Sequence, residues 1–134
     1  MADRLALCID LDRCWGCGTC EVACAMGRGA PPGRGRVKVA EIDDAAGPDS
    51  PPSRAFVPVI CQHCDEAACL EACPTGALYR GDGGLVLFDA ALCASCGACE
   101  SACPFGAISL SQDAGMPEKC DLCAERQAKG LLPS

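Results

Sequence analysis

The sequence predicts a small α+β protein with short strands, short helices and long loops. Of its 15 cysteines in 134 residues, twelve fall into three runs of four, with gaps of two to four residues. Segments around these runs also repeat. The chain has 15 glycines and 10 prolines but only 4% aromatic residues, so its apolar core must be thin. Bound metal is therefore expected to supply much of the stability that a larger core would give.

The clearest run has the spacing C-x2-C-x2-C-x3-C-P and ends at Pro104; its thiols are Cys93, Cys96, Cys99 and Cys103. This is the ligand pattern of bacterial ferredoxin-type 4Fe-4S proteins. Three thiolates from one tight loop surround part of a cubane. The fourth follows on a short helical turn, and in two-cluster ferredoxins it ligates the other cluster. Runs of this kind therefore come in pairs.

The partner run lies upstream and has one gap widened to four residues; its thiols are Cys61, Cys64, Cys69 and Cys73. The residues that follow repeat as CPTGAL and CPFGAI. Proline ends the helical turn, glycine permits a sharp reversal, and an apolar strand is expected to leave. We predict two clusters with crossed ligands. One is held by Cys61, Cys64, Cys69 and Cys103, and the other by Cys93, Cys96, Cys99 and Cys73.

A third run near the N-terminus repeats the C-x2-C-x2-C-x3-C spacing with Cys14, Cys17, Cys20 and Cys24. Ala25 replaces the proline, so the chain need not turn sharply here. Trp15 lies inside this loop. Its ring either covers a cluster against water or offers a contact surface to a redox partner.

The segment before this run, Leu5 to Cys14, resembles Leu85 to Cys93, because each has an Asp four residues before its first ligand. This repeat predicts a short strand before each loop. It also places Cys8 at a core-facing position, where a free thiol behaves as a small hydrophobe. The alternative for Cys8 is a role as an additional ligand.

Between the first two runs the composition changes. Four basic residues lie among glycines and prolines: Arg28, Arg34, Arg36 and Lys38. They form either a solvated face or a site that docks an acidic partner or neutralises the field of a cluster. The alternating sequence VAEID predicts a strand, and the sequence from Asp43 to Ser53 predicts a loop. Ala55 to Ile60 is apolar, but Pro58 restricts it to an edge or irregular strand.

His63 lies between two ligands of the second run. The motif already supplies four thiols, so we expect its ring N–H to face a cluster sulfide or the bulk phase, with iron ligation as the less favoured alternative. Disulfides are disfavoured by the odd cysteine count and the close spacing. Zinc sites use separate C-x2-C pairs and do not need an unbroken four-Cys run.

The formal charge is −7, and each cubane with four thiolates adds about −2. Such an acidic protein is not expected to bind nucleic acid or an anionic membrane surface. The sequence shows no apolar run of about 18 residues and no leader-like start, so we expect no membrane insertion and a cytoplasmic location. Export bound to a partner that carries a signal is the alternative.

One more C-x2-C follows, with Cys120 and Cys123 in KCDLCAERQAKG. With the three complete runs in this order, the chain from Leu5 onward resembles the four-cluster iron-sulfur subunits of molybdenum and tungsten oxidoreductases. Examples serve dimethyl sulfoxide reductase, formate dehydrogenase and, as a small subunit, bacterial tungsten aldehyde oxidoreductase. The resemblance implies a single polyferredoxin unit over 1–134 with two pseudo-symmetric bacterial-ferredoxin-like modules. Residues 55–110 form one module, and 1–54 plus 111–134 form the other.

The resemblance also implies the ligands of two outer clusters. Cys14, Cys17 and Cys20 belong to a third cluster, and Cys24, Cys120 and Cys123 to a fourth. Each set is one thiol short, because the family pattern continues past LLPS with two further cysteines. We therefore expect four 4Fe-4S clusters, with three as the alternative. The missing ligands lie beyond this sequence, or Cys8, an Asp or a water takes their place.

The sequence shows no nucleophile–base–acid constellation and no phosphate-binding loop. We expect a non-catalytic subunit that relays single electrons between a large Mo/W-pterin catalytic subunit and another carrier. Further copies of the chain, or a flavin or ferredoxin subunit, could extend the relay. Alternatives are a free polyferredoxin, a ferredoxin-like subunit of a hydrogenase or carbon monoxide dehydrogenase, and a cluster-bearing enzyme or sensor with an open iron site.

Overall fold

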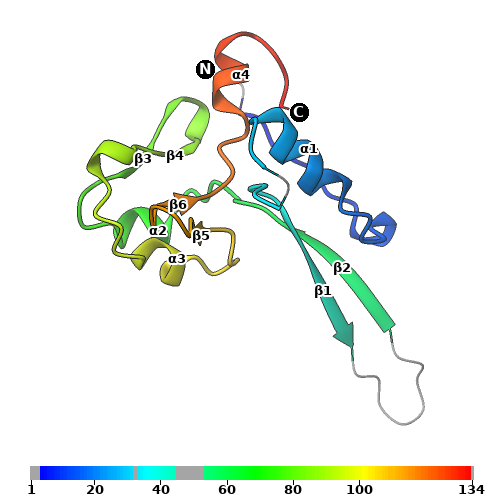
Figure 1. Cartoon of the computed structure of the whole chain (residues 1–134). Coiled ribbons are helices and arrows are strands. Elements are labelled where there is room, and N and C mark those ends of the chain that lie inside the picture. The colour runs from blue at the N-terminus through cyan, green and yellow to red at the C-terminus, as the bar shows by residue number, and fades with distance from the viewer. Residues whose placement is uncertain (1–3, 32, 45–52, 134) are drawn as a thin grey trace. The chain divides into compact units, whose positions relative to one another are not determined.

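The computed structural model describes residues 4–31, 33–44 and 53–133. The chain divides into two compact units, Leu7–Val59 and a second one formed by Met1–Ala6 with Ile60–Ser134. Every sheet in the described residues is an antiparallel pair of strands (Figure 1). The secondary structure is therefore a mixture of short helices and small strands, as the sequence predicted.

The unit Leu7–Val59 contains one helix and one hairpin. A 3-10 turn at Leu11–Arg13 leads into the first cysteine run, and α1 spans Thr19–Gly27. Strand β1 (Lys38–Asp44) pairs with β2 (Ser53–Val59). Both strands were predicted, and β2 contains Pro58 in a two-stranded sheet, where an edge is always available. The predicted loop at Asp43 to Ser53 lies mostly outside the described residues.

The other unit has two very short hairpins and three short helices. Helix α2 (Ala68–Glu71) precedes β3 (Leu78–Arg80), which pairs with β4 (Val86–Phe88) around a turn at Asp82–Gly84. After a 3-10 turn at Ala90–Leu92, α3 (Ala98–Ala102) precedes β5 (Ser109–Leu110), which pairs with β6 (Pro117–Glu118). Helix α4 (Ala124–Ala128) follows.

The repeated CPxGA segments fold as predicted. Gly76 and Gly106 have φ of 70° and 61°, a region that residues with a Cβ rarely adopt. The reversal places Leu78 and Ile108, each 4% exposed, at the start of the strands that follow. In contrast, α1 continues for nine residues through Cys24 and past Ala25, where no proline stops it.

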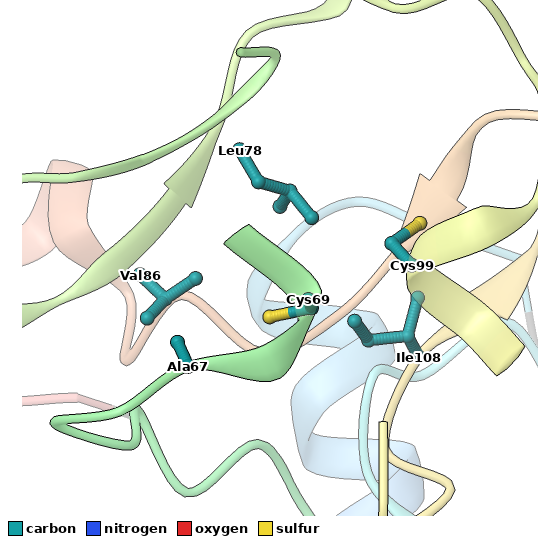
Figure 2. Close-up of a cluster of buried hydrophobic side chains, with 6 residues drawn as sticks. All are labelled: Ala67, Cys69, Leu78, Val86, Cys99 and Ile108. Carbon is teal, nitrogen blue, oxygen red and sulfur yellow. The ribbon is translucent and has the colours of Figure 1, made fainter. Parts of the chain in front are cut away.

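The core of this unit is thin and contains ligand-type cysteines. Its buried members are mainly small side chains from the helices and strands just described: Ala67, Cys69, Leu78, Val86, Cys99 and Ile108 (Figure 2). Val86, 1% exposed, is the largest fully buried side chain among the described residues. The sulfur atoms of Cys69 and Cys99 point in different directions (Figure 2). The apolar core thus lies between thiols that face separate places.

The predicted strand before the first run is wrong. Residues 4–10 form no strand, and Cys8 is exposed and not buried in the core. The equivalent segment before Cys93 is a strand because β4 pairs with β3. Among the described residues, no strand pairs with 4–10. The repeat in sequence therefore gives the same strand only where a partner strand is present.

Candidate metal centres

All four C-x2-C loops share one backbone feature. The residue before the second Cys has a positive φ in each loop: 75° at Gly16, 47° at His63, 53° at Ser95 and 49° at Leu122. Only one of these residues is glycine, so three loops carry the cost of a left-handed conformation in a residue with a Cβ. The loop with Cys120 and Cys123 therefore has the same local geometry as the loops of the complete runs.

The positive φ turns a backbone N–H toward the first sulfur. Ser95 N donates to Cys93 Sγ, and Leu122 N donates to Cys120 Sγ, both at 3.3 Å. Donors near a sulfur favour its charged form, which is the form that binds metal.

The approach to the first and third runs is also shared. Asp10 and Asp89 each cap a 3-10 turn, because their carboxylates accept from Asp12 N at 3.2 Å and Ala91 N at 2.9 Å. The sequence repeat between these segments thus corresponds to a repeated turn.

A hollow of about 330 Å³ lies beside the third run. Its lining includes Cys93, Cys96 and Cys99, together with Cys73 of the second run. Apolar side chains complete the wall, among them Leu78, Phe88, Leu110 and Pro117. The crossed ligand set predicted from the sequence is therefore brought to one cavity, and its chemistry and size fit a cluster that needs four thiolates and little water.

Cys73 is the thiol with the most donors around it. The backbone N–H of Leu78 lowers the pKa of Cys73 to about 7, and Thr75 and Ala77 contribute in the same direction. Thr75 Oγ1 lies 3.7 Å from the sulfur. The residues that follow the run therefore stabilise a thiolate that faces the loop of the third run.

The other inner ligand set also comes together. Burial raises the pKa of Cys69, and the charges of Cys61 and Cys103 raise it further. Cys64 packs against the same core. Three thiols of the predicted set are thus close enough to interact, and one of them comes from the third run.

The first run lies in the unit Leu7–Val59. Cys17 Sγ donates to Thr19 Oγ1 at 3.3 Å, and Arg36 N donates to Cys24 Sγ at 3.3 Å. Burial raises the pKa of Cys20. A Cβ on Gly16 would overlap the ring of Phe56, so this ring packs directly on the loop.

Two interpretations from the sequence change here. Trp15 is 79% exposed, which fits a contact surface and not a cover; Phe56, which sequence reasoning missed, packs on the loop instead. Of the basic residues, Arg36 is not on a fully solvated face, because it is only partly exposed and its backbone contacts Cys24 Sγ.

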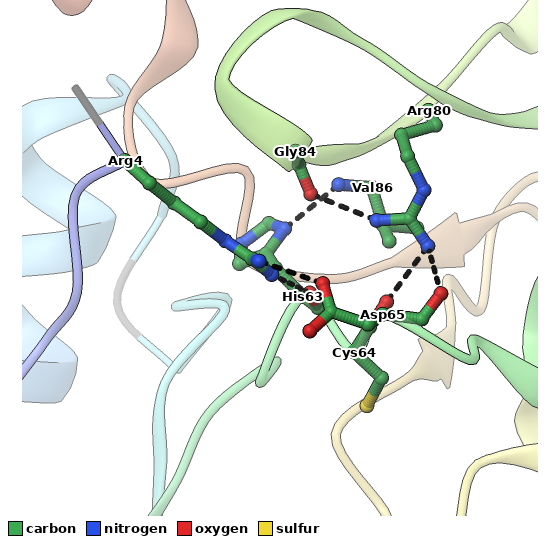
Figure 3. Close-up of polar contacts among 7 residues, drawn as sticks. All are labelled: Arg4, His63, Cys64, Asp65, Arg80, Gly84 and Val86. Atoms are coloured by element: carbon green, nitrogen blue, oxygen red, sulfur yellow. Dashed lines mark hydrogen bonds and ion pairs between the residues drawn. The ribbon is translucent and has the colours of Figure 1, made fainter. Parts of the chain in front are cut away.

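His63 is buried and neutral. Burial lowers the pKa of its imidazole to about 4, and the nearby cations, Lys119 foremost, add to the effect. Nδ1 accepts from Val86 N at 2.9 Å, so the ring proton resides on Nε2, which has no partner among the described residues (Figure 3). One ring nitrogen thus holds strand β4. The other is a buried donor of the kind that a cluster sulfide would satisfy.

Two arginines fix the loop that carries His63. Arg4 donates to the His63 carbonyl at 3.2 Å and pairs with Asp65 at 2.6 Å. Arg80 donates to the carbonyls of Cys64 and Asp65 at 2.8 and 2.7 Å (Figure 3). Sequence reasoning missed this network because nothing in the spacing marks it.

The fourth loop is buried. Cys120 is 8% exposed; burial raises the pKa of its thiol to about 11, and the charge of Cys61 also raises it. Asp121 accepts from Cys123 N at 2.9 Å. Among the described residues, no three His, Cys, Asp or Glu side chains converge on one point as they would around a single metal ion.

Comparison with known proteins places these loops in a family. Residues 53–134 match the 4Fe-4S dicluster domain, and residues 11–27 match a 4Fe-4S binding domain. The chain belongs to the family of 4Fe-4S electron-transfer subunits of molybdoenzymes. This family subunit therefore carries 4Fe-4S clusters and is neither a disulfide scaffold nor a zinc protein.

Three relatives illustrate the match. A tetrathionate reductase subunit of Archaeoglobus fulgidus is 40% identical over 92% of this chain and 57% of its own length. The thiosulfate reductase electron transfer subunit of Salmonella typhi is 40% identical over 93% of this chain and 66% of its own length. A polypeptide of the anaerobic dimethyl sulfoxide reductase of Escherichia coli is 33% identical, with shares of 99% and 68%. The chain thus spans between about half and two thirds of these relatives.

Proposed function

We propose that this subunit relays single electrons between a catalytic oxidoreductase subunit and another redox carrier. The carrying observation is the hollow in which Cys73 of the second run joins three thiols of the third. Such crossed ligation places two clusters close together, which electron relay requires. The relatives, which are subunits of tetrathionate, thiosulfate and dimethyl sulfoxide reductases, support this role.

The protein's own residues hold, shield and tune the clusters. When bound, a 4Fe-4S cluster supplies one-electron redox chemistry. The thiolates of the runs hold it, and N–H donors such as Ser95 N reduce the charge on sulfur. Leu78, Phe88 and Leu110 keep water from the hollow. No residue is assigned to substrate chemistry.

We propose four clusters with the ligands predicted from the sequence. The inner two use Cys61, Cys64, Cys69 and Cys103, and Cys93, Cys96, Cys99 and Cys73. The outer two use Cys14, Cys17 and Cys20, and Cys24, Cys120 and Cys123. The shared backbone of the four C-x2-C loops supports a ligand role for Cys120 and Cys123. Two pseudo-symmetric modules, 55–110 and 1–54 plus 111–134, would follow from this wiring; the compact units divide the chain elsewhere, at residue 60.

The partner we propose is a large Mo/W-pterin catalytic subunit. Three exposed apolar side chains on or beside the first run support a docked subunit over a freely diffusing carrier: Leu11, Trp15 and Met26, which are 53%, 79% and 75% exposed. Among the described residues, no helix is long and apolar enough to cross a membrane. A cytoplasmic location stays a prediction from the sequence.

The test is a count of iron and acid-labile sulfide on the native complex, purified without oxygen, with intact mass measured on the same sample. About sixteen irons per chain support four clusters, and about twelve support three. Absence of sulfide would sink the proposal. A purely monomeric holoprotein with no co-purifying catalytic subunit would favour the free polyferredoxin.

A further inference from the structure

Lys119 is a buried cation without a visible counter-charge. It lies directly before Cys120 and is 3% exposed. Its ammonium donates to two neutral acceptors, the carbonyl oxygens of Val86 and Cys120, the latter at 2.7 Å. Among the described residues, no carboxylate forms an ion pair with it. A buried ammonium is strongly unfavourable unless a negative group lies near it.

Two predicted ligand loops meet at this lysine. Its charge lowers the thiol pKa values of both Cys69 and Cys120, against the larger effect of burial, so it lies near members of two ligand sets. Val86 links the loops further. Its carbonyl accepts from Lys119, while its N–H donates to Nδ1 of His63, which lies between Cys61 and Cys64 (Figure 3).

We propose that Lys119 is the internal counter-cation of two clusters, the one held by Cys61, Cys64, Cys69 and Cys103 and the one that uses Cys120 and Cys123. This inference rests on the proposed function. Each oxidised cluster with four thiolates carries about −2, which supplies the missing negative charge. Lys119 is thus a positioning residue that acts through both ligand loops and through its charge.

The proposal has a direction. Reduction adds one negative charge to a cluster, and a nearby buried cation stabilises the reduced form more than the oxidised form. Lys119 therefore raises the reduction potentials of both clusters. Removal of its charge should lower them, while the cluster held by Cys93, Cys96, Cys99 and Cys73 should change less.

The test compares Lys119→Met with Lys129→Met in the anaerobically purified holoprotein. Lys129 is an exposed lysine that pairs with Glu125 at 2.9 Å, so it controls for loss of one positive charge. Iron and sulfide are counted first, and redox titration is then followed by electron paramagnetic resonance. In Lys119→Met we expect at least a tenfold shift of two reduction equilibria toward the oxidised form, about 59 mV. Unchanged potentials, or equal shifts in the control, would overturn the proposal.

Loss of iron in Lys119→Met is met by two further variants. If Lys119→Arg keeps its iron and Lys119→Gln loses it, the charge is needed and the proposal stands. If both lose it equally, shape and not charge is required, and the proposal fails. If both keep it, a lower potential in Lys119→Gln alone supports it, and equal potentials overturn it. Wild-type protein without clusters would instead sink the proposed function itself.

Discussion

The Cys14–Cys24 and Cys93–Cys103 runs have identical spacing but different surroundings. Both follow an Asp-capped 3-10 turn, and both have a left-handed glycine before the helix, Gly18 and Gly97. The later run faces a hollow that is walled by apolar strands. The earlier run continues into a longer helix and leaves Trp15 79% exposed.

This difference shows which part of a ligand site is local. The backbone of each loop follows from a few residues of its own, so it is the same in both runs. The walls come from distant segments: Leu110 and Pro117 lie beside the later run, whereas Phe56 packs on the earlier one at Gly16. The two sites should therefore respond differently when a wall, a ligand or the metal is changed.

Removal of iron should have the largest effect and should erase the difference. The core holds few large side chains, and Val86 is the largest that is fully buried among the described residues. We expect the apo chain to be largely unfolded, because ligand binding and folding are then one process. The measurement is circular dichroism with a thermal scan after anaerobic chelation. A cooperative transition that survives chelation would contradict this prediction.

Cys73→Ala should damage one cluster, and it should be the one beside the later run. The thiol lines the hollow with Cys93, Cys96 and Cys99, although it belongs to the second run in sequence. We expect loss or conversion of that cluster in electron paramagnetic resonance, with the Cys61, Cys64 and Cys69 signal retained. Cys8→Ala, at an exposed thiol, is the control and should leave all signals unchanged. Damage confined to the cluster of Cys61, Cys64 and Cys69 would refute crossed ligation.

The ligand loops and their order could be predicted from the sequence because cysteine spacing reports local geometry directly. Glycine and proline after Cys73 and Cys103 likewise gave the reversals at Gly76 and Gly106. The strand expected at Leu5 to Cys14 failed because strand formation depends on a partner, which spacing does not reveal.

The supporting residues were harder to predict. Lys119 looks like an ordinary surface lysine in the sequence, and its burial depends on the carbonyl of Val86, 33 residues away. His63 was expected to act beside a cluster, but its bond to Val86 N was not foreseen. Contacts across such distances in sequence leave no periodic signal, so only the cysteine before which Lys119 stands could have pointed to it.

Gly16→Ala should weaken the earlier run more than an equivalent change elsewhere. Its φ is 75°, and a Cβ would overlap the ring of Phe56. Gly29→Ala is the control, because it shares a positive φ of 63° but has open space around it. We expect Gly16→Ala to be about 1–3 kcal/mol more destabilising than the control, from overpacking. The readout is the thermal midpoint of the holoprotein and its iron release to a chelator, and equal values would show that the Phe56 contact is unimportant.

Trp15→Ala should have the smallest effect on stability and should decide between the two roles considered for this ring. Because the side chain is 79% exposed, its removal should change the free energy of unfolding by less than about 0.5 kcal/mol. A contact role predicts weaker association with the catalytic subunit, by about 2 kcal/mol if the ring is central to the interface. Leu132→Ala, at a residue 74% exposed, is the control for loss of a surface apolar side chain. If iron release accelerates while association is unchanged, Trp15 shields a cluster after all, and the earlier run is closer in design to the later one than its exposure indicates.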